Sequence, residues 1–329
     1  MAAAPGGAVV ALTVVGPRGD GGFDRLGLTP IDGRGAQPGR LYDLGAPVRF
    51  PRDGAVSVGP GGEVYLGLEA HCAPSACRGL GAPLDGSGLV QFSAGGDPAW
   101  MARLPGAVAS QPVVDPDGDP AIATSEGGAN VVRSFTAAGA PRWQASLPGG
   151  AAAEVVLAAD SGSNVLVGRG DELAKIDSHG AVAWTRSVGA QIAGVAGTRS
   201  GVVVVAGVTA RGPAILEVEP DGTDGPVYPL PGPAEDVRVE VGEGHRIGAV
   251  TGAGGCGATL TALEVDGGEV WSRPVAAAGC DGSELRVNAV TVTTEGAAVV
   301  GGALAGTVDL GGGGVSSNGT DGLVAGFGP

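Results

Sequence analysis

Hydrophobic and polar residues alternate over short segments along most of the chain, with the period of two that is typical of half-buried β-strands. Examples are Leu89–Phe92, Val131–Phe135 and Ile215–Val218. A glycine-bearing turn follows each of them, which favours a hairpin. A second hairpin lies upstream in each stretch, as in Val56–Leu66. The pattern predicts an all-β chain built from units of four short strands, which we letter A to D.

The four tryptophans reveal a repeat. They are Trp100, Trp143, Trp184 and Trp271, separated by 43, 41 and 87 residues, and Tyr228 lies midway in the longest interval. Each tryptophan closes a G-x-x-x-W sequence that follows the third strand of its unit. Four antiparallel strands in about 40–50 residues are the signature of a β-propeller blade.

Two tyrosines occupy shortened versions of the same turn, in Gly39–Tyr42 and Gly225–Tyr228. We expect these tyrosines to take the place of tryptophan in their blades. Because every blade of a repeat protein meets the same neighbouring surface, we expect each aromatic ring to fill the gap between adjacent blades. A ring of aromatic side chains that stacks on a ligand is the alternative.

The repeats predict a single β-propeller domain over residues 1–329. The expected blades are roughly 9–47, 48–106, 107–149, 150–190, 191–233, 234–286 and 287–329. Seven blades are favoured and six are the second choice, since Val9–Gly45 has room for three strands and the last blade stops at Phe327 after its third. We expect one terminus to complete the blade of the other, which would remove an unpaired edge.

The recurring turn D-x-x-G-x-x-x-W, as in Asp177–Trp184, resembles the repeats of PQQ-type (quinoprotein-like) propellers. The segments Gly306–Gly314 and Gly319–Phe327 are similar to secreted propeller-repeat proteins of myxobacteria. The resemblance implies a propeller over residues 48–329. Quinoprotein dehydrogenases are longer and carry acidic and cysteine motifs that this sequence lacks. The resemblance therefore implies the architecture and not the enzyme activity.

Composition and net charge limit the secondary structure and the classes of partner that we expect. The chain has 65 glycines and 24 prolines, which suits turns rather than long helices. It carries 34 acidic and 19 basic residues, a formal net charge of −15. This charge disfavours nucleic acids and anionic membrane surfaces. The sequence has no apolar run of the ~18–20 residues that a membrane-spanning helix needs, and no secretory signal is visible.

The cysteines suggest a compartment. Cys72 and Cys77 lie together in an insertion between strands B and C of the second blade. Cys256 and Cys280 fall in a B–C loop and the following D–A loop, which emerge on the same face of a propeller. We therefore favour the disulfides Cys72–Cys77 and Cys256–Cys280, which imply an oxidising, extracytoplasmic location. Free thiols, or one metal site built from all four, are the alternatives.

Two further motifs suggest metal or catalytic chemistry. Asp115–Asp119 resembles a calcium-binding loop, but Pro120 replaces the glycine that such a loop requires, and the same place in other blades is a plain turn. The three histidines are dispersed over different blades and read as solvated loop residues: His71, His179 and His245. We treat the glycosylation sequon Asn318–Thr320 as a chance match.

Binding residues are expected on the face that bears the B–C and D–A loops, because long loops on a rigid scaffold carry function. This face includes the insertion Glu69–Asp85 and the glycine-rich segment Gly306–Asp321. The alternative is that both are merely tolerated insertions. The candidate residues are Glu69, His71, Arg78, Arg169, Asp171, Arg211, Asp309 and Asp321.

The sequence thus predicts a non-catalytic, monomeric, extracytoplasmic scaffold that binds a protein or a cell-surface component. It predicts no catalytic residue, cofactor or metal. A quinoprotein-like or lyase-type enzyme and a sugar-binding lectin are the alternatives. An axial pocket lined with arginine, histidine or carboxylate side chains would favour the enzyme, and a repeated polar-aromatic pocket would favour the lectin.

Overall fold

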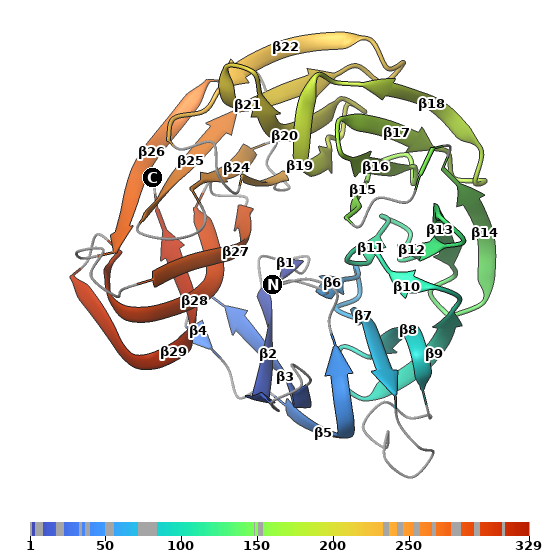
Figure 1. Ribbon diagram of the computed structural model, residues 1–329, viewed down its shortest axis with the longest axis horizontal. Coiled ribbons are helices and arrows are strands. Elements are labelled where there is room, and N and C mark those ends of the chain that lie inside the picture. Colours follow the sequence, from blue (N-terminus) through green and yellow to red (C-terminus); the bar gives the residue numbers. More distant parts are fainter. Residues whose placement is uncertain are drawn as a thin grey trace. The chain divides into compact units, whose positions relative to one another are not determined.

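Figure 1 shows the computed structural model of the chain. It describes residues 2–3, 9–17, 23–32, 35–36, 40–49, 56–71, 84–147, 149–150, 154–232, 237–241, 246–252, 257–264, 268–277, 284–292, 297–310 and 313–328. These residues form strands β1 to β29, and none of them is helical. Accordingly, no helix in this part of the chain is long and apolar enough to cross a membrane.

The strands are short and follow one another closely. The first fourteen are β1 Ala2–Ala3, β2 Val9–Pro17, β3 Phe23–Asp32, β4 Gly35–Ala36, β5 Arg40–Arg49, β6 Val56–Val58, β7 Val64–His71, β8 Asp85–Phe92, β9 Pro98–Leu104, β10 Ala107–Val108, β11 Val113–Val114, β12 Pro120–Glu126, β13 Ala129–Phe135 and β14 Pro141–Ser146. The others are β15 Val156–Ala159, β16 Val165–Arg169, β17 Glu172–Ile176, β18 Val182–Ser187, β19 Ala190–Gly197, β20 Val203–Thr209, β21 Gly212–Val218, β22 Asp224–Pro229, β23 Arg238–Val241, β24 Arg246–Thr251, β25 Gly257–Glu264, β26 Glu269–Ala277, β27 Glu284–Val292, β28 Ala298–Asp309 and β29 Gly314–Phe327.

Within each blade, strands that are neighbours in the sheet pair antiparallel, which confirms the predicted all-β propeller architecture. The clearest repeats are the sheets β15-β16-β17-β18 and β19-β20-β21-β22. Sheet β10-β12-β13-β14 has the same order, with β11 as a second short strand beside β12. Each of the two other sheets joins two neighbouring blades, through the pairing of β5 with β7 near the N-terminus and of β26 with β28 near the C-terminus.

Six blades have four antiparallel strands. A seventh group of strands begins at Glu284, close to the start of the last of the seven expected blades, so the choice between seven blades and six stays a prediction. The sequence pattern predicts three strands in the first blade, but β1 pairs with β2 and supplies a fourth. The last group, β27-β28-β29, has three strands in the described part of the chain. Short strands such as β1 are difficult to predict, because two residues show no periodicity.

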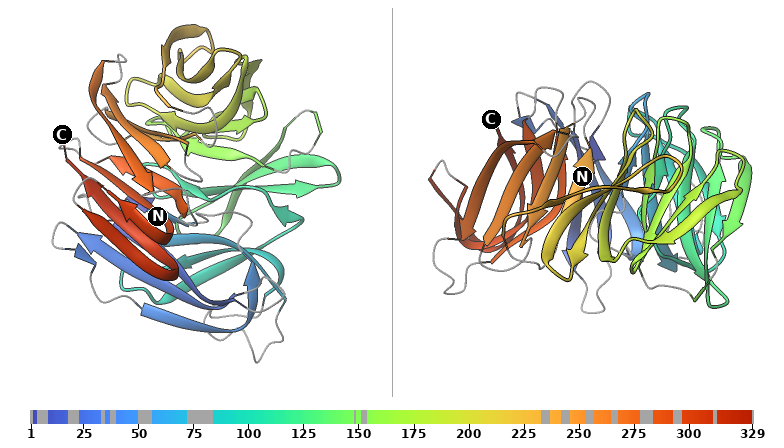
Figure 2. Two further views of the ribbon diagram at one scale, coloured as in Figure 1. Left: turned by 60° about the vertical axis from the view of Figure 1, so that its left-hand side comes forward. Right: turned by 90° about the horizontal axis from the view of Figure 1, so that it is seen from above.

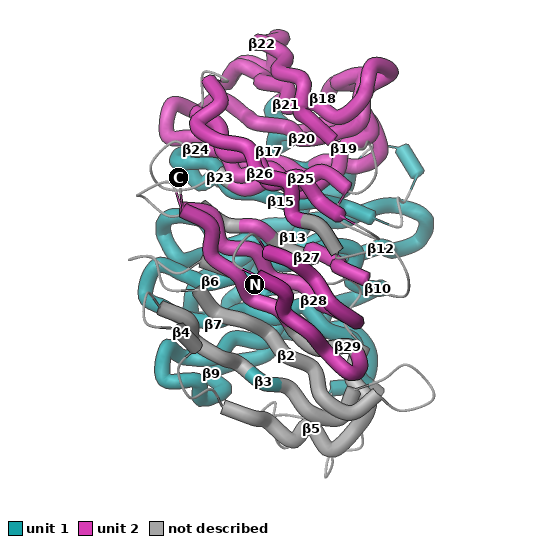
Figure 3. Tube along the Cα trace, turned by 90° about the vertical axis from the view of Figure 1, so that its left-hand side faces the viewer, with its two compact units in different colours: residues 1–167, 175–183 teal, residues 168–174, 184–329 magenta. Residues whose placement is uncertain are grey.

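The chain divides into two compact units, coloured separately in Figure 3. Unit 1 contains residues 1–167 and 175–183, and unit 2 contains residues 168–174 and 184–329. Each has its own apolar core. Buried side chains of unit 1 include Tyr65 and Ile122, whereas unit 2 has one cluster around Ile247 and another around Trp271. The expectation of a single domain stays a prediction.

The A–B and C–D turns share one geometry. In the β13–β14 turn, Thr136 N–H donates to Ala140 O over 2.7 Å and Gly139 N–H donates to Thr136 O over 2.8 Å. Gly139 has a φ of +83°, a conformation that glycine adopts without strain. Glycine holds the same place in six further turns, with Gly62, Gly96, Gly118, Gly180, Gly201 and Gly222. Ser163 takes this place in the β15–β16 turn with a φ of 57°, the only non-glycine residue with a positive φ in the described chain.

Three tryptophans pack on these turn glycines in the next blade. A Cβ atom added to Gly139 would lie 2.7 Å from Cδ2 of Trp100, so only glycine leaves room for the indole ring. Trp143 packs on Gly180 in the same way, and Trp184 packs on Gly222. These contacts confirm the predicted packing between blades for three of the four tryptophans.

Burial and position of the aromatic residues differ in part from the prediction. Trp271 is 9% exposed and joins the core around β27 to β29, but Trp100, Trp143 and Trp184 are only half-buried. Tyr228 does not take the tryptophan position. It pairs with Ile215, three residues before the end of β21. Trp100 and Trp143 pair one residue before the ends of β8 and β13, and Trp271 pairs two residues before the end of β25. Tyr228 lies six residues after its turn glycine Gly222, whereas Trp143 lies four residues after Gly139.

Candidate functional site

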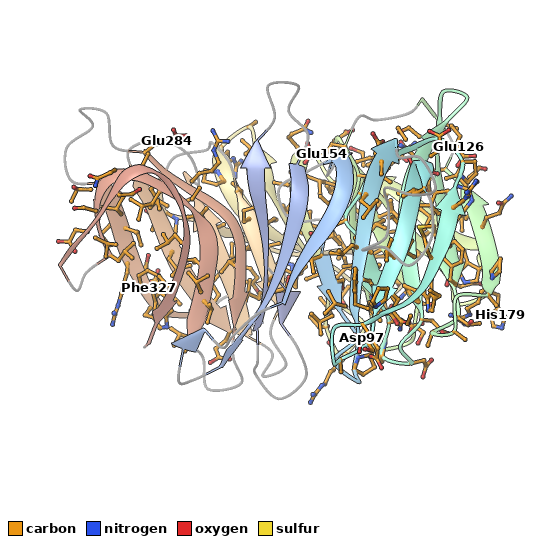
Figure 4. All side chains as sticks on the ribbon, turned by 90° about the horizontal axis from the view of Figure 1, so that it is seen from below. Asp97, Glu126, Glu154, His179, Glu284 and Phe327 are labelled. Atoms are coloured by element: carbon orange, nitrogen blue, oxygen red, sulfur yellow. The ribbon has the colours of Figure 1, made fainter. Side chains whose placement is uncertain are left out.

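Charged residues lie at both ends of the strands. In Figure 4, which shows all described side chains, Glu126 lies at one end of the strands of unit 1, and Asp97 and His179 lie at the other. Glu126 ends β12 at a B–C turn, whereas Asp97 and His179 belong to C–D turns. We call these the loop end and the turn end.

Three turns meet at the loop end of unit 2, and we name residues 169–172, 187–191 and 209–212 together the loop rim. Asp171 O accepts a hydrogen bond from Val188 N–H over 2.9 Å, and Gly170 O accepts one from Ile192 N–H over 2.7 Å. The ladder between β19 and β20 then places Ala190 opposite Thr209. Backbone contacts therefore hold the three turns side by side.

Side chains reinforce the loop rim. Ser187 Oγ donates to Asp171 Oδ2 over 2.7 Å. Arg169, which is 8% exposed, donates through Nε to Glu172 Oε1 over 2.9 Å, so its charge is neutralised within the rim. Thr209 Oγ1 donates to Gly212 O over 2.9 Å and accepts from Arg211 N–H over 3.1 Å. These bonds fix the short turns from which the exposed residues project.

The exposed polar side chains of the loop rim are Asp171, Ser187, Gln191 and Arg211. The structure thus brings together three of the residues predicted from sequence, Arg169, Asp171 and Arg211. Arg169 differs from the prediction because it is buried and ion-paired, which makes it a support for the rim. Ser187 and Gln191 were missed, since the D–A connection that carries them is short and shows no charged motif.

The loop end of unit 1 has similar internal contacts. Glu69 Oε1 accepts a hydrogen bond from Val108 N–H over 3.1 Å, so this predicted residue ties β7 to β10. Arg133 Nη2 donates to Glu126 Oε2 over 2.9 Å. Burial tends to raise the pKa of Glu126, but the bonds from Arg133 and Thr124 outweigh it and lower the pKa below its ordinary value. These carboxylates are therefore engaged in holding neighbouring strands.

The predicted glycine-rich loop Gly306–Asp321 is instead mostly a hairpin. Strand β28 continues to Asp309 and β29 begins at Gly314, and Figure 2 shows these long strands in red. Asp309 Oδ1 accepts from Gly313 N–H over 3.2 Å and so helps to close the connection. Asp321 lies within the ladder opposite Leu304. The small residues favoured a loop, but they pair in a continuous antiparallel ladder between β28 and β29.

Several sequence predictions lie outside the described residues. They concern Arg78, His245 and the four cysteines, and for His71 only the backbone is described. The disulfide pairs therefore stay predictions.

The turn end of unit 1 holds a shallow depression lined by Asp115, Asp119, Arg142, Trp143, Ser163 and neighbouring apolar residues, with no space for a water molecule. Asp115 Oδ1 accepts hydrogen bonds from Asp119 N–H over 2.8 Å and Asp117 N–H over 3.0 Å. Arg142 Nη1 lies 2.8 Å from Asp119 Oδ2. The carboxylates thus close the turn and pair with arginine, and no group of three metal-ligating side chains converges among the described residues.

Comparisons with known proteins address the fold. No family profile and no curated protein sequence matches the chain. Among solved structures it is similar to a streptogramin B lyase, with 12% identity, 89% of this chain and 94% of that chain covered, and a TM-score of 0.59. It is also similar to BamB from Moraxella catarrhalis, with 14% identity, coverage of 88% and 96%, and a TM-score of 0.50. A puromycin hydrolase shows 18% identity, coverage of 93% and 50%, and a TM-score of 0.54.

Identities this low show a shared fold and nothing finer. The similarity to BamB, a PQQ-like propeller, supports the resemblance to that group at the level of the fold. The similar structures include a lyase, a hydrolase and BamB, so the fold is compatible with several functions.

Proposed function

We propose that this chain is a non-catalytic binding scaffold that presents the loop rim of unit 2 to a protein partner. The observation that carries the proposal is the construction of the rim. Asp171, Ser187, Gln191 and Arg211 are exposed, yet the turns that bear them are fixed by backbone and side-chain hydrogen bonds. Rigid turns lose little conformational entropy on binding, which favours recognition.

The charges of the rim favour a polar protein surface as the partner. Glu172 neutralises Arg169, so the exposed charges are the carboxylate of Asp171 and the guanidinium of Arg211. A mixed pair of this kind suits a surface with complementary charges and hydrogen-bonding groups. We place the protein outside the cytoplasm, since the proposed disulfides Cys72–Cys77 and Cys256–Cys280 require an oxidising compartment.

The proposal is tested by capture of proteins from the envelope and culture medium of the producing cell. The chain is immobilised as wild type, as Arg211→Glu and as Arg199→Glu. Arg211 and Arg199 are both exposed, and they lie at opposite ends of the same β19–β22 sheet, so the second variant is a matched control. Thermal unfolding should be alike for the three proteins, because neither position is buried.

We expect Arg211→Glu to reduce capture of a specific protein at least tenfold, about 1.4 kcal/mol, while Arg199→Glu retains it. Equal losses in the two variants, or retention by Arg211→Glu, would contradict the assignment to the loop rim. Failure of the wild type to capture any protein would contradict the scaffold function itself.

A further inference from the structure

The hairpin of β28 and β29 contains an insertion at Asn318 and Gly319. In the ladder, Ala305 lies opposite Thr320, whereas the next residue, Gly306, lies opposite Ser317. Two residues of β29 are therefore extra, and neither has an opposite residue in β28. The local sequence is Asn-Gly, the only such pair in the chain.

The inserted residues are open to water. Asn318 and Gly319 are both exposed, and a Cβ atom added to Gly319 would meet no atom within 4 Å. Gly319 N–H donates to Ser317 Oγ over 3.1 Å, and Ser317 Oγ donates to Gly319 O over 2.8 Å. A serine hydroxyl two residues away thus engages the Gly319 amide. Such a short-range bond exchanges with water more easily than a bond within the ladder.

We propose that Asn318 is a site of spontaneous deamidation in the folded protein. The Gly319 amide nitrogen loses its proton and attacks Cγ of Asn318, a C–N bond forms, and ammonia leaves. The product is a five-membered succinimide. Water then adds to one of its two carbonyl carbons and opens the ring, giving aspartate when the Cγ–N bond breaks and isoaspartate when the backbone C–N bond breaks. No oxidant or reductant is needed.

The fold permits both the reaction and its products. Glycine after asparagine leaves the attacking nitrogen uncrowded and allows the backbone torsions that ring closure needs. Isoaspartate adds one methylene group to the main chain, and the insertion can absorb it because the ladder pairs on either side stay in place. Each event adds one negative charge on an exposed surface, where it is readily solvated.

Two other asparagines serve as internal controls. Asn130 is 0% exposed, lies opposite Ser125 in the ladder and precedes Val131, whose branched side chain crowds the amide. Asn164 donates from Nδ2 to both carboxylate oxygens of Asp160 over 2.9 Å and precedes Val165. Their side-chain amides are held away from the backbone nitrogen that would attack.

The test is incubation of the purified full chain at pH 7 and pH 9, at a temperature below unfolding. Peptide mass spectrometry with fragmentation that distinguishes aspartate from isoaspartate follows each asparagine. A synthetic peptide spanning residues 315–322 is incubated alongside, and Gly319→Ala is the matched variant. Circular dichroism at the end of the incubation verifies that the protein is still folded.

We expect Asn318 to convert in the folded protein within several-fold of the peptide rate, faster at pH 9, with both products present. Asn130 and Asn164 should retain their amides, and Gly319→Ala should slow the conversion several-fold. The proposal is overturned if Asn318 keeps its amide while the peptide reacts, because the fold would then hold the residue away from the reactive conformation. It is equally overturned if Gly319→Ala reacts as fast as wild type.

Discussion

The packing of tryptophan on turn glycines predicts a large and specific cost for Gly139→Ala. Gly139 has a φ of +83°, where a residue with a Cβ atom loses about 1–2 kcal/mol. The new Cβ atom would also lie 2.7 Å from Trp100 Cδ2, so the ring must move. Displacing a packed side chain costs about 1–3 kcal/mol. The bond from Trp100 Nε1 to Ala137 O, now 2.9 Å, would contribute a further loss of ~1 kcal/mol.

Gly128→Ala is the matched control. Gly128 has a φ of +86° in the β12–β13 turn of the same blade, and a Cβ atom there would meet nothing within 4 Å. It therefore isolates the backbone cost. We expect Gly128→Ala to lower the free energy of unfolding by about 1–2 kcal/mol and Gly139→Ala by about 3–6 kcal/mol.

The measurement is urea-induced unfolding of wild type and both variants, followed by tryptophan fluorescence and by far-ultraviolet circular dichroism. Comparable slopes against urea would validate the comparison of the unfolding free energies. The native fluorescence of Gly139→Ala should also shift to longer wavelength, since Trp100 moves toward water. Equal destabilisation by the two substitutions would refute the reasoning, because the indole contact would then contribute nothing beyond the backbone.

Two further predictions concern the A–B turns. Ser163→Gly should stabilise the protein by up to ~1 kcal/mol in the same urea assay, because it relieves the backbone strain at φ 57° and loses only an exposed hydrogen bond to Asp117. A destabilisation would show that this hydrogen bond contributes more than the relief of strain. Burial tends to raise the pKa of Asp160, but Lys175 Nζ at 2.8 Å and the hydrogen bonds from Asn164 lower this pKa below its ordinary value. The stabilising effect of the Asp160 carboxylate is therefore present at neutral pH and is lost as the pH falls through the folded pKa. In the equivalent turn, burial raises the pKa of Asp115, so its contribution is fully present in acid and declines as the pH rises through the folded pKa. Asp160→Asn should therefore lower the free energy of unfolding mainly at neutral pH. Asp115→Asn keeps an oxygen acceptor, and it should lower the free energy of unfolding less at neutral pH than in acid. Parallel pH profiles of the unfolding free energy for the two variants would contradict both assignments.

Local regularities were accessible from the sequence because they repeat. The alternation in Val131–Phe135, the turn glycine Gly139 and the spacing of Trp100 and Trp143 each reflect short-range constraints, and many copies average out local ambiguity. The strands, the turns and the tryptophan contacts follow from them. The number of complete blades did not follow from the sequence. It depends on whether short strands such as β1 pair, and pairing is decided by residues outside the strand itself.

The candidate site shows the same division. Asp171 and Arg211 were predicted as charged residues in B–C turns, and their position at the loop end follows from the order of the strands. Only the tertiary structure shows that Ser187 lies beside Asp171. It also shows that the Arg169 side chain is buried and paired with Glu172. Contacts of this kind depend on which turns the sheets bring together, and a side chain's exposure depends on its neighbours in space.

The sequence by itself determined the all-β repeat, its turns and the end of the strands at which Asp171 and Arg211 lie, because these are set by periodicity and by the conformational freedom of glycine. Only the tertiary structure decided that Gly306–Asp321 forms paired strands, and that Asn318 and Gly319 have no opposite residue in the ladder. Register is the common reason. A shift of one or two residues changes little in the local sequence preference but changes every partner across the sheet, so it is fixed by the sum of contacts along both strands.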